Sequence, residues 1–257
     1  MLKPIIVYWS PNSPDPLYAN YNIEDFNDPE PLSKSAFKSQ LGDPYFYICP
    51  AIKDVARQVY SVSTKFDENA KIDSKLLKAY HDNEDGSLHP RTVDGASVTE
   101  NNPLLTCNRN SSLKDHVNFN YGRSWIFFAD EPVIAKFTSP WLPPTSPAPG
   151  AMVVPGKFNI GNWFRDFHVD YFAPISTTSW TYSKNVPIFY IELETDRPII
   201  FKRFDIRENE VLKQIANECM LTSQNFDKPY GLEKRYKDFR KKNHHKTILS
   251  ELSNVTK

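Results

Sequence analysis

The stretch Ser124-Trp125-Ile126-Phe127-Phe128-Ala129 consists almost entirely of apolar and aromatic residues, and it decides the predicted fold class. A second stretch, Pro132-Val133-Ile134-Ala135-Lys136-Phe137, follows after only Asp130 and Glu131. Aromatic and β-branched residues favour strands, and a short polar pair between two such runs is typical of a tight connection. We therefore predict two consecutive strands here.

Similar short runs with turn residues between them occur on both sides of this pair. They cover residues 4–9, 45–49, 59–63, 151–154, 167–172, 186–193 and 198–204, and residues 51–58 favour two helical turns. Many short strands separated by turns are typical of antiparallel sandwiches and jelly rolls. We expect a mainly β chain, an antiparallel sandwich or jelly roll of roughly eight to ten strands.

The composition fits such a fold and excludes several classes of protein. The 257 residues are 40% hydrophobic, 14% aromatic and 24% charged, which rules out disorder of the whole chain. Lys plus Arg and Asp plus Glu both number 31, so the total charge gives no reason to expect nucleic acid or an anionic membrane. No apolar run approaches the roughly 18 residues of a membrane span.

Three cysteines occur, at Cys49, Cys107 and Cys219, without a Cys-x-x-Cys pair. This number and spacing exclude a zinc ribbon and a disulfide scaffold, so we expect buried, reduced thiols. The first residues lack the small-residue cleavage site of a signal peptide and are interpreted as the first strand.

The end of the chain changes from strand to helix periodicity. Asp205-Ile206-Arg207-Glu208 has the pattern of a capping box, and one helical stripe follows. That stripe consists of Val211, Leu212, Ile215, Ala216, Cys219 and Met220. After a break at 227–231, a second helix is predicted over 232–252. We thus divide the chain into a β-rich domain, residues 1–204, and a basic extension of two helices, residues 205–257.

His168-Val169-Asp170 is the sharpest candidate for chemistry. Residues two apart on a strand point the same way, and a histidine with a carboxylate can supply two ligands of a mononuclear iron. The only later histidines, His244 and His245, lie in the basic helix, which is the wrong place for a third ligand. A cupin-like iron-dependent oxygenase using His168 and Asp170 is therefore the alternative hypothesis, and a half-exposed strand face is the preferred one.

Trp163, Phe164 and Arg165 place two large aromatic side chains beside a guanidinium group. Arg165 could stack on Trp163 or close a pocket for an anion. Large aromatic residues usually fill cores, so we favour a core anchor in which Arg165 pairs with Asp166 or Asp170.

The second predicted helix carries a cluster of basic residues. Its polar face contains Lys234, Arg235, Lys237, Arg240, Lys241, Lys242 and Lys246. The cluster could lie on phosphates, but no nucleic-acid motif accompanies it. We favour a solvated helix face or a surface that meets an acidic partner, with nucleic-acid binding through this helix as an alternative.

Motifs of nucleophilic catalysis and of phosphate binding do not occur. There is no Gly-x-Ser-x-Gly elbow, Walker loop or Gly-x-Gly-x-x-Gly sequence. We therefore expect binding rather than catalysis, and no cofactor apart from the iron of the alternative hypothesis.

Three segments together resemble a known group of proteins. They are Cys49-Pro50-Ala51, the segment Val154-Pro155-Gly156-Lys157-Phe158-Asn159-Ile160-Gly161-Asn162-Trp163-Phe164-Arg165, and Val186 to Phe204 with its Asp196-Arg197-Pro198 turn. In sequence order they resemble uncharacterised proteins of large contractile-tailed phages of marine bacteria, cyanophages especially, over most of residues 1–220. The resemblance implies a phage protein in the host cytoplasm or the virion, and no catalytic residue follows from it.

The expected function is therefore that of a non-catalytic phage protein that binds another protein, of phage or host origin. It would act in virion assembly or structure, or in takeover of the host, with no role for a membrane. The aromatic-rich faces and the basic helix are the expected binding surfaces.

Overall fold

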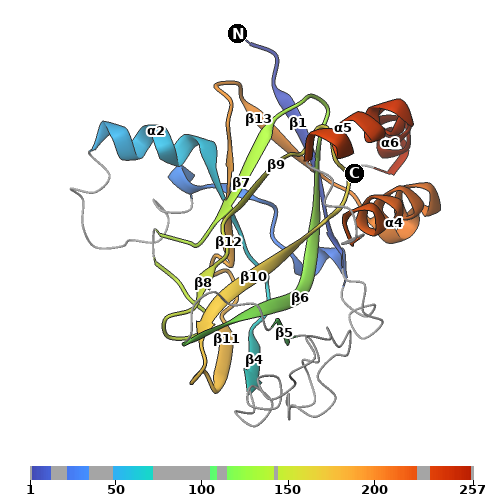
Figure 1. The fold of residues 1–257 in the computed structure, drawn as a ribbon. Coiled ribbons are helices and arrows are strands. Elements are labelled where there is room, and N and C mark those ends of the chain that lie inside the picture. Colours follow the sequence, from blue (N-terminus) through green and yellow to red (C-terminus); the bar gives the residue numbers. More distant parts are fainter. Residues whose placement is uncertain are drawn as a thin grey trace.

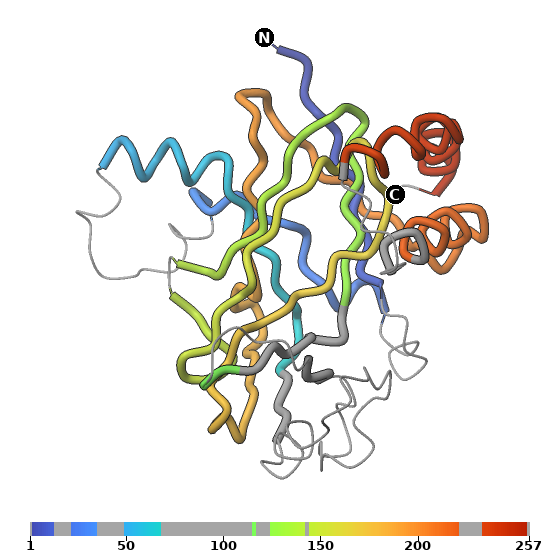
Figure 2. The backbone as a smooth tube through the Cα atoms, viewed as in Figure 1, coloured from blue at the N-terminus to red at the C-terminus, as the bar shows by residue number. Residues whose placement is uncertain are grey.

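The structure is a computed structural model that describes residues 2–12, 22–34, 49–71, 105–108, 115–141, 144–224 and 232–255 (Figures 1 and 2). These residues form two packed β-sheets, a separate two-stranded ribbon and helices at the carboxyl end. The predicted mainly β class with C-terminal helices is confirmed. The strand predicted at 45–49 lies outside the described residues except for Cys49, which precedes a helix rather than ending a strand.

The first sheet has the strand order β13-β1-β6-β10-β8, and β5 also pairs with β6. Its strands are β1 (Ile5–Asn12), β5 (Leu105–Asn108), β6 (His116–Ala129), β8 (Met152–Val153), β10 (Asp166–Pro174) and β13 (Ile199–Arg203). Every pair is antiparallel except β1 with β13, which is parallel. The predicted antiparallel arrangement thus includes one parallel pair at this edge, because the chain reaches β13 from the other sheet.

The second sheet has the order β2-β3-β12-β7-β9 and is antiparallel throughout. Its strands are β2 (Glu30–Pro31), β3 (Val59–Val62), β7 (Ile134–Thr138), β9 (Gly156–Asn159) and β12 (Phe189–Leu193). A separate ribbon joins β4 (Glu68–Lys71) to β11 (Ser179–Tyr182). The 3₁₀ turn η2 (Ile23–Asp25) and the helix α2 (Pro50–Gln58) complete the amino-terminal half, and α2 confirms the helical turns predicted at 51–58.

The strands β6 and β7 follow each other as predicted, but they do not pair, because each belongs to a different sheet. The chain leaves the first sheet at Asp130, whose Oδ1 accepts a hydrogen bond from the Ile6 N–H at 2.9 Å. The connection from β12 to β13 also crosses between the sheets. Arg197 lies in the connection from β12 to β13, and Glu131 lies in the connection from β6 to β7. The Arg197 Nη2 donates to the Glu131 Oε1 at 2.9 Å, so an ion pair links the two connections.

An aromatic core fills the space between the two sheets. Trp125 from β6 meets Phe189 from β12 edge to face at 5.1 Å, and Phe127 lies 6.4 Å from the same ring. The core also contains Trp9 and Phe137, which are completely buried. Such ring pairs contribute beyond the apolar area that they bury.

The other face of the first sheet is also covered. Ile126 and Phe128 point away from the aromatic core and belong to a second buried cluster with the carboxyl-terminal helices. The first sheet is thus the middle one of three layers, with the helices on one side and the second sheet, and α2 beyond it, on the other (Figure 1). A strand buried on both faces has no polar alternation, which explains the unbroken apolar run at 125–129.

The carboxyl-terminal helices are α4 (Glu210–Gln224), α5 (Leu232–Lys241) and α6 (His244–Val255). The single helix predicted over 232–252 is divided at Asn243, whose φ of 55° lies in the left-handed region that ends helices. Within the described residues, no helix is long and apolar enough to cross a membrane. The division at residues 204 and 205 stays a prediction, although the helices pack directly on the sheet.

The start of α4 differs from the predicted capping box. Asp205 caps the short 3₁₀ turn η3 (Ile206–Glu208) by accepting from the Arg207 N–H at 2.9 Å. The α4 helix is capped instead by Asn209, whose Oδ1 accepts from the Leu212 N–H at 2.9 Å. Four residues of the predicted apolar stripe, Leu212, Ile215, Ala216 and Cys219, are buried as expected. Met220 is half-buried, and Val211 in the first turn of α4 is exposed.

Candidate functional site

A polar cluster lies on the helix-facing side of the first sheet. On β10, Val169 and Tyr171 enter the aromatic core, so the alternating residues His168 and Asp170 face the opposite way. The prediction that His168 and Asp170 share one face is confirmed. Both are only half-buried, so the cluster reaches the surface.

Neighbouring strands add polar side chains that the sequence analysis missed. Ser124 of β6 lies opposite Asn12 on one side and opposite His168 on the other. Asn12 Nδ2 donates to Asp166 Oδ1 at 2.6 Å, and Ser124 Oγ donates to the Asn12 carbonyl at 2.7 Å. Polar residues at the ends of apolar strands were the available signal, but only the strand register brings them together.

The pairing of β6 with β10 is irregular at this point. His168 pairs with Ser124, whereas Val169 pairs with Tyr121, so β6 has two extra residues, Gly122 and Arg123, between these partners. Irregular pairing of this kind often occurs beside functional sites, where it redirects side chains.

Arg165 lies next to this cluster and is largely buried. Its Nε donates to the Asp166 carbonyl at 2.9 Å. Burial lowers the pKa of Arg165, the nearby charges of Asp166 and Asp170 oppose that effect, and the like charge of Arg235 adds to it. The guanidinium group stays protonated in spite of this.

Trp163 takes the position that we expected of a core anchor. It is buried in the cluster between sheet and helices, with its ring 6.3 Å from that of Phe239. A cation–π contact is made by another arginine, Arg203, whose guanidinium carbon lies 5.0 Å from the ring centre of Trp9.

Two buried nitrogen atoms of polar side chains on β10 and α5 make no hydrogen bond. They are Nδ1 of His168 and Nε of Arg235, which comes from α5. Burial also lowers the pKa of His168, with Asp166 and Asp170 opposing the effect, so the imidazole is neutral at pH 7. The predicted binding residue Arg235 is half-buried, so its Nε does not lie on the outer surface of the helix.

The described residues contain no group of three or more histidine, cysteine, aspartate or glutamate side chains that could hold a metal ion. His244 and His245 begin α6 and pack against Phe239 and Phe128, with ring distances of 5.5 and 5.4 Å. They are therefore engaged away from β10. An iron site at His168 and Asp170 stays a prediction.

The two cysteines with described side chains differ. Cys219 is buried, and burial raises the pKa of its thiol to about 12, so it does not form a reactive thiolate. Cys49 is exposed, so the expectation of buried thiols is wrong for it. It lies directly before the first residue of α2.

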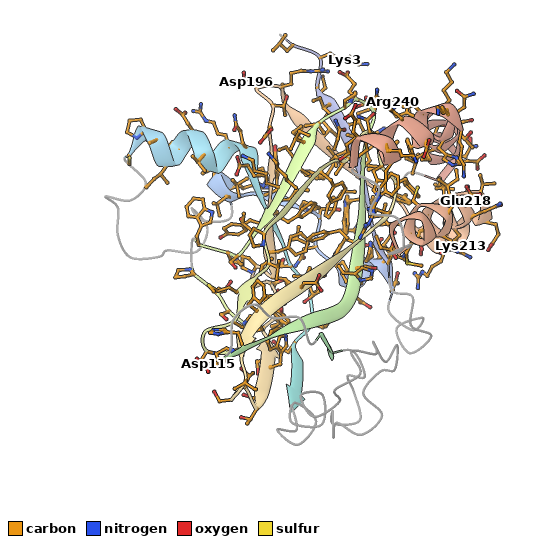
Figure 3. All side chains as sticks on the ribbon, in the orientation of Figure 1. Lys3, Asp115, Asp196, Lys213, Glu218 and Arg240 are labelled. Atoms are coloured by element: carbon orange, nitrogen blue, oxygen red, sulfur yellow. The ribbon has the colours of Figure 1, made fainter. Side chains whose placement is uncertain are left out.

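The basic surface is formed by the exposed basic residues of α5, of α6 and of the turn between them. These are Lys234, Lys237, Arg240, Lys241, Lys242 and Lys246. Residues 232–255 contain seven lysines and arginines and three acidic residues, which gives a net charge of +4. Glu218 and Arg240 project from the helical side of the molecule (Figure 3).

Acidic neighbours balance part of that surface. Lys237 Nζ lies 2.9 Å from Glu233, and Lys242 Nζ lies 3.0 Å from Glu218 of α4. Such exposed pairs contribute little to stability, but they reduce the positive potential of the helices.

No family model, curated protein or solved structure matches this chain. The resemblance to phage proteins is therefore an untested expectation.

Acidification is expected to destabilise the fold through three histidines. Burial is the largest cause lowering the pKa of His168, His244 and His245. The unfolded chain, in which histidine has a pKa of about 6.5, then binds protons more readily than the folded chain. The free energy of unfolding should therefore be highest above about pH 6.5 and fall as the pH decreases below it.

The loss of stability is measured as the difference between the urea unfolding midpoints at about pH 7.5 and about pH 5.5. Most carboxylates stay ionised at both pH values, so the difference reports mainly on histidines. The variant His244→Gln, His245→Gln should show a smaller difference between the two midpoints. An equal difference in the wild type and the variant would contradict a role for these two histidines.

Proposed function

We propose that this chain is a non-catalytic binding protein that engages an acidic surface of another protein through α5 and α6. The observation that supports this is a basic surface presented on helices that are firmly attached to the sheet. Charge complementarity of this kind speeds association and selects partners.

The attachment of these helices involves both apolar and polar contacts. Phe239, Ile248 and Leu252 are buried in the cluster shared with the first sheet. The Asn159 N–H donates to the Tyr236 hydroxyl at 2.7 Å, and Arg240 Nε donates to Asn162 at 3.4 Å. The exposed lysines thus have a fixed arrangement, which reduces the entropy lost on binding.

A protein partner fits this surface better than nucleic acid does. Glu233 and Asp238 alternate with the lysines of α5, and Lys241 lies 3.8 Å from Asp238. Binding to phosphates depends on several uncompensated positive charges, whereas a mixed pattern suits a protein surface with matching charges. Nucleic-acid binding is thus the less supported alternative.

The biological setting of the proposal rests on the three segments that resemble phage proteins. In that setting the chain acts in virion assembly or on a host factor, in the host cytoplasm or the virion. Mass spectrometry of purified virions would test the virion assignment, because a structural protein is present there in many copies.

Reversing charges on the basic surface should weaken partner binding. The variant Lys241→Glu, Lys246→Glu is expected to raise the Kd for the partner roughly tenfold, because favourable contacts with acidic groups become repulsive. The partner is first isolated from infected cells with the wild-type chain and identified, and its Kd is then measured with purified components. The variant Lys157→Glu, Lys184→Glu makes the same charge change at exposed positions outside α5 and α6.

An unchanged Kd in the Lys241→Glu, Lys246→Glu variant would contradict the proposed surface. Loss of capture after nuclease treatment would identify a nucleic acid as the ligand and contradict a protein partner. Equal weakening by the control variant would indicate a general charge effect.

A further inference from the structure

Strand β13 stands at one edge of the first sheet, where β1 is its neighbour within the described residues. The Ile5 N–H donates to the Pro198 carbonyl at 2.9 Å. At the other end of the pair, the Phe204 N–H donates to the Trp9 carbonyl at 3.0 Å. Together with the register, in which Ile5 lies opposite Ile199, these hydrogen bonds fix which residues direct their backbone groups toward β1. They are Pro198, Ile200, Lys202 and Phe204.

The residues between them direct their backbone groups away from β1. These residues are Ile199, Phe201 and Arg203. Within the described part of the chain, their N–H and C=O groups make no hydrogen bond. No residue of β13 is buried, and Ile200 is 45% exposed. The edge is therefore accessible to a further strand, which would supply partners for these groups.

The usual protections of an edge strand do not block this one. Pro198 has no N–H, but it belongs to the set that faces β1, so the free edge loses no donor. The Lys202 side chain stands on one face of the sheet and leaves the backbone edge open. The charge of Arg203 is balanced within the chain, because Glu24 and Asp28 lie 2.8 and 2.9 Å from its guanidinium group.

We propose that β13 of a second copy of this chain pairs antiparallel with this edge, around a two-fold axis at Phe201. In this register Ile199 of each copy lies opposite Arg203 of the other, and the two Phe201 residues lie opposite each other. All the outward N–H and C=O groups of both strands then have partners. Such a two-fold interface is self-complementary and ends at the dimer. The inference goes beyond the proposed function and does not need it, because α5 and α6 take no part.

The charges of residues 197–205 favour this register over its neighbours. Lys202 lies opposite Ile200 of the second copy. One residue beyond each end of the ladder, Arg197 comes opposite Asp205. A shift by two residues in one direction would place Lys202 opposite Lys202, and a shift in the other direction would place Arg203 opposite Arg197. Like charges directly opposite each other are destabilising, and the proposed register avoids them.

Sedimentation velocity of the purified chain, from about 1 µM to about 1 mM, tests this interface. Two short strands bury less surface than a standard interface, so we expect a weak dimer with a Kd of about 100 µM. Ile200→Lys places a lysine opposite each Lys202 of the dimer and should raise the Kd roughly tenfold or more. Val55→Lys makes the same change at a residue of α2 that is 46% exposed, and it should leave the Kd unchanged.

The double variant Ile200→Lys, Lys202→Glu tests the register itself. Each introduced lysine then lies opposite a glutamate of the other copy, so the Kd should return to within about threefold of the wild-type value. Amide hydrogen exchange provides a second measurement. The N–H groups of Ile199, Phe201 and Arg203 should exchange more slowly in concentrated than in dilute protein.

A chain that stays monomeric at about 1 mM, or an unchanged Kd in Ile200→Lys, would overturn the proposal. Equal weakening by Val55→Lys would contradict β13 as the interface, and a double variant that fails to recover would contradict the register. If the three outward N–H groups exchange slowly even in dilute protein, the edge is occupied within the chain and closed to a second copy. Fast exchange in a monomeric chain would equally overturn self-pairing and leave the edge to a strand of another protein.

Discussion

Replacing Gly161 with alanine is expected to cost ~3 kcal/mol or more of folding free energy, or to prevent folding. A Cβ atom at this position would collide with the carbonyl oxygen of Glu131 and would lie 2.8 Å from the Cα of Pro132. These are backbone atoms, so no side-chain rotation can relieve the collision. Relief requires the two segments to separate.

That separation would break contacts that join the two sheets. The Ile160 N–H donates to the Val133 carbonyl at 3.0 Å, and the Ala129 N–H donates to the Ile160 carbonyl at 3.2 Å. The segment around Gly161 therefore holds the connection between β6 and β7 in place. The same segment also supports α5 through Asn159 and Asn162.

Gly156→Ala provides the matched control for this experiment. A Cβ at Gly156 would meet no atom within 4 Å, so the substitution should change the free energy of unfolding by less than ~1 kcal/mol. Urea unfolding of the two variants measures the difference. If Gly161→Ala were as stable as Gly156→Ala, the close approach of Gly161 to the backbone of Glu131 and Pro132 would be wrong.

Replacing Phe128 with alanine is expected to cost about 3–5 kcal/mol, because the ring is completely buried between the first sheet and the helices. Its ring lies 5.4 Å from Phe164, 6.3 Å from Phe239 and 5.4 Å from His245. The cavity would therefore affect the contacts of α5 and α6 directly. Amide hydrogen exchange should become faster in these helices than in the second sheet.

Ile200→Ala is the control for the second experiment. Ile200 is 45% exposed on the edge strand β13, and its truncation should change the free energy of unfolding by less than about 1 kcal/mol. If Phe128→Ala also cost less than this, the helices would not be packed on the sheet as described. Uniform exchange throughout the chain would point instead to global unfolding.

The candidate site shows what a single sequence can provide. His168 and Asp170 could be placed on one face because strand alternation is local and has a period of two. Asn12 and Ser124 could not be found, because they meet β10 only through the register of two long-range strand pairings. Arg235 was assigned to an exposed helix face, but its Nε is buried, because α5 packs on the sheet.

The amino-acid order by itself indicated the long apolar strands and the helical end of the chain, because these preferences depend on neighbouring residues, but it did not indicate the short strands β4, β5, β9 and β11. The unbroken apolar run at 125–129 indicated a strand, and its burial on both faces came from the structure. Only the tertiary structure decided that β6 and β7 enter different sheets, that β13 pairs in parallel with β1, and that the carboxyl-terminal helices cover the first sheet. These arrangements result from contacts between residues far apart in sequence, whose free energies depend on the packing of the whole chain and not on any local pattern.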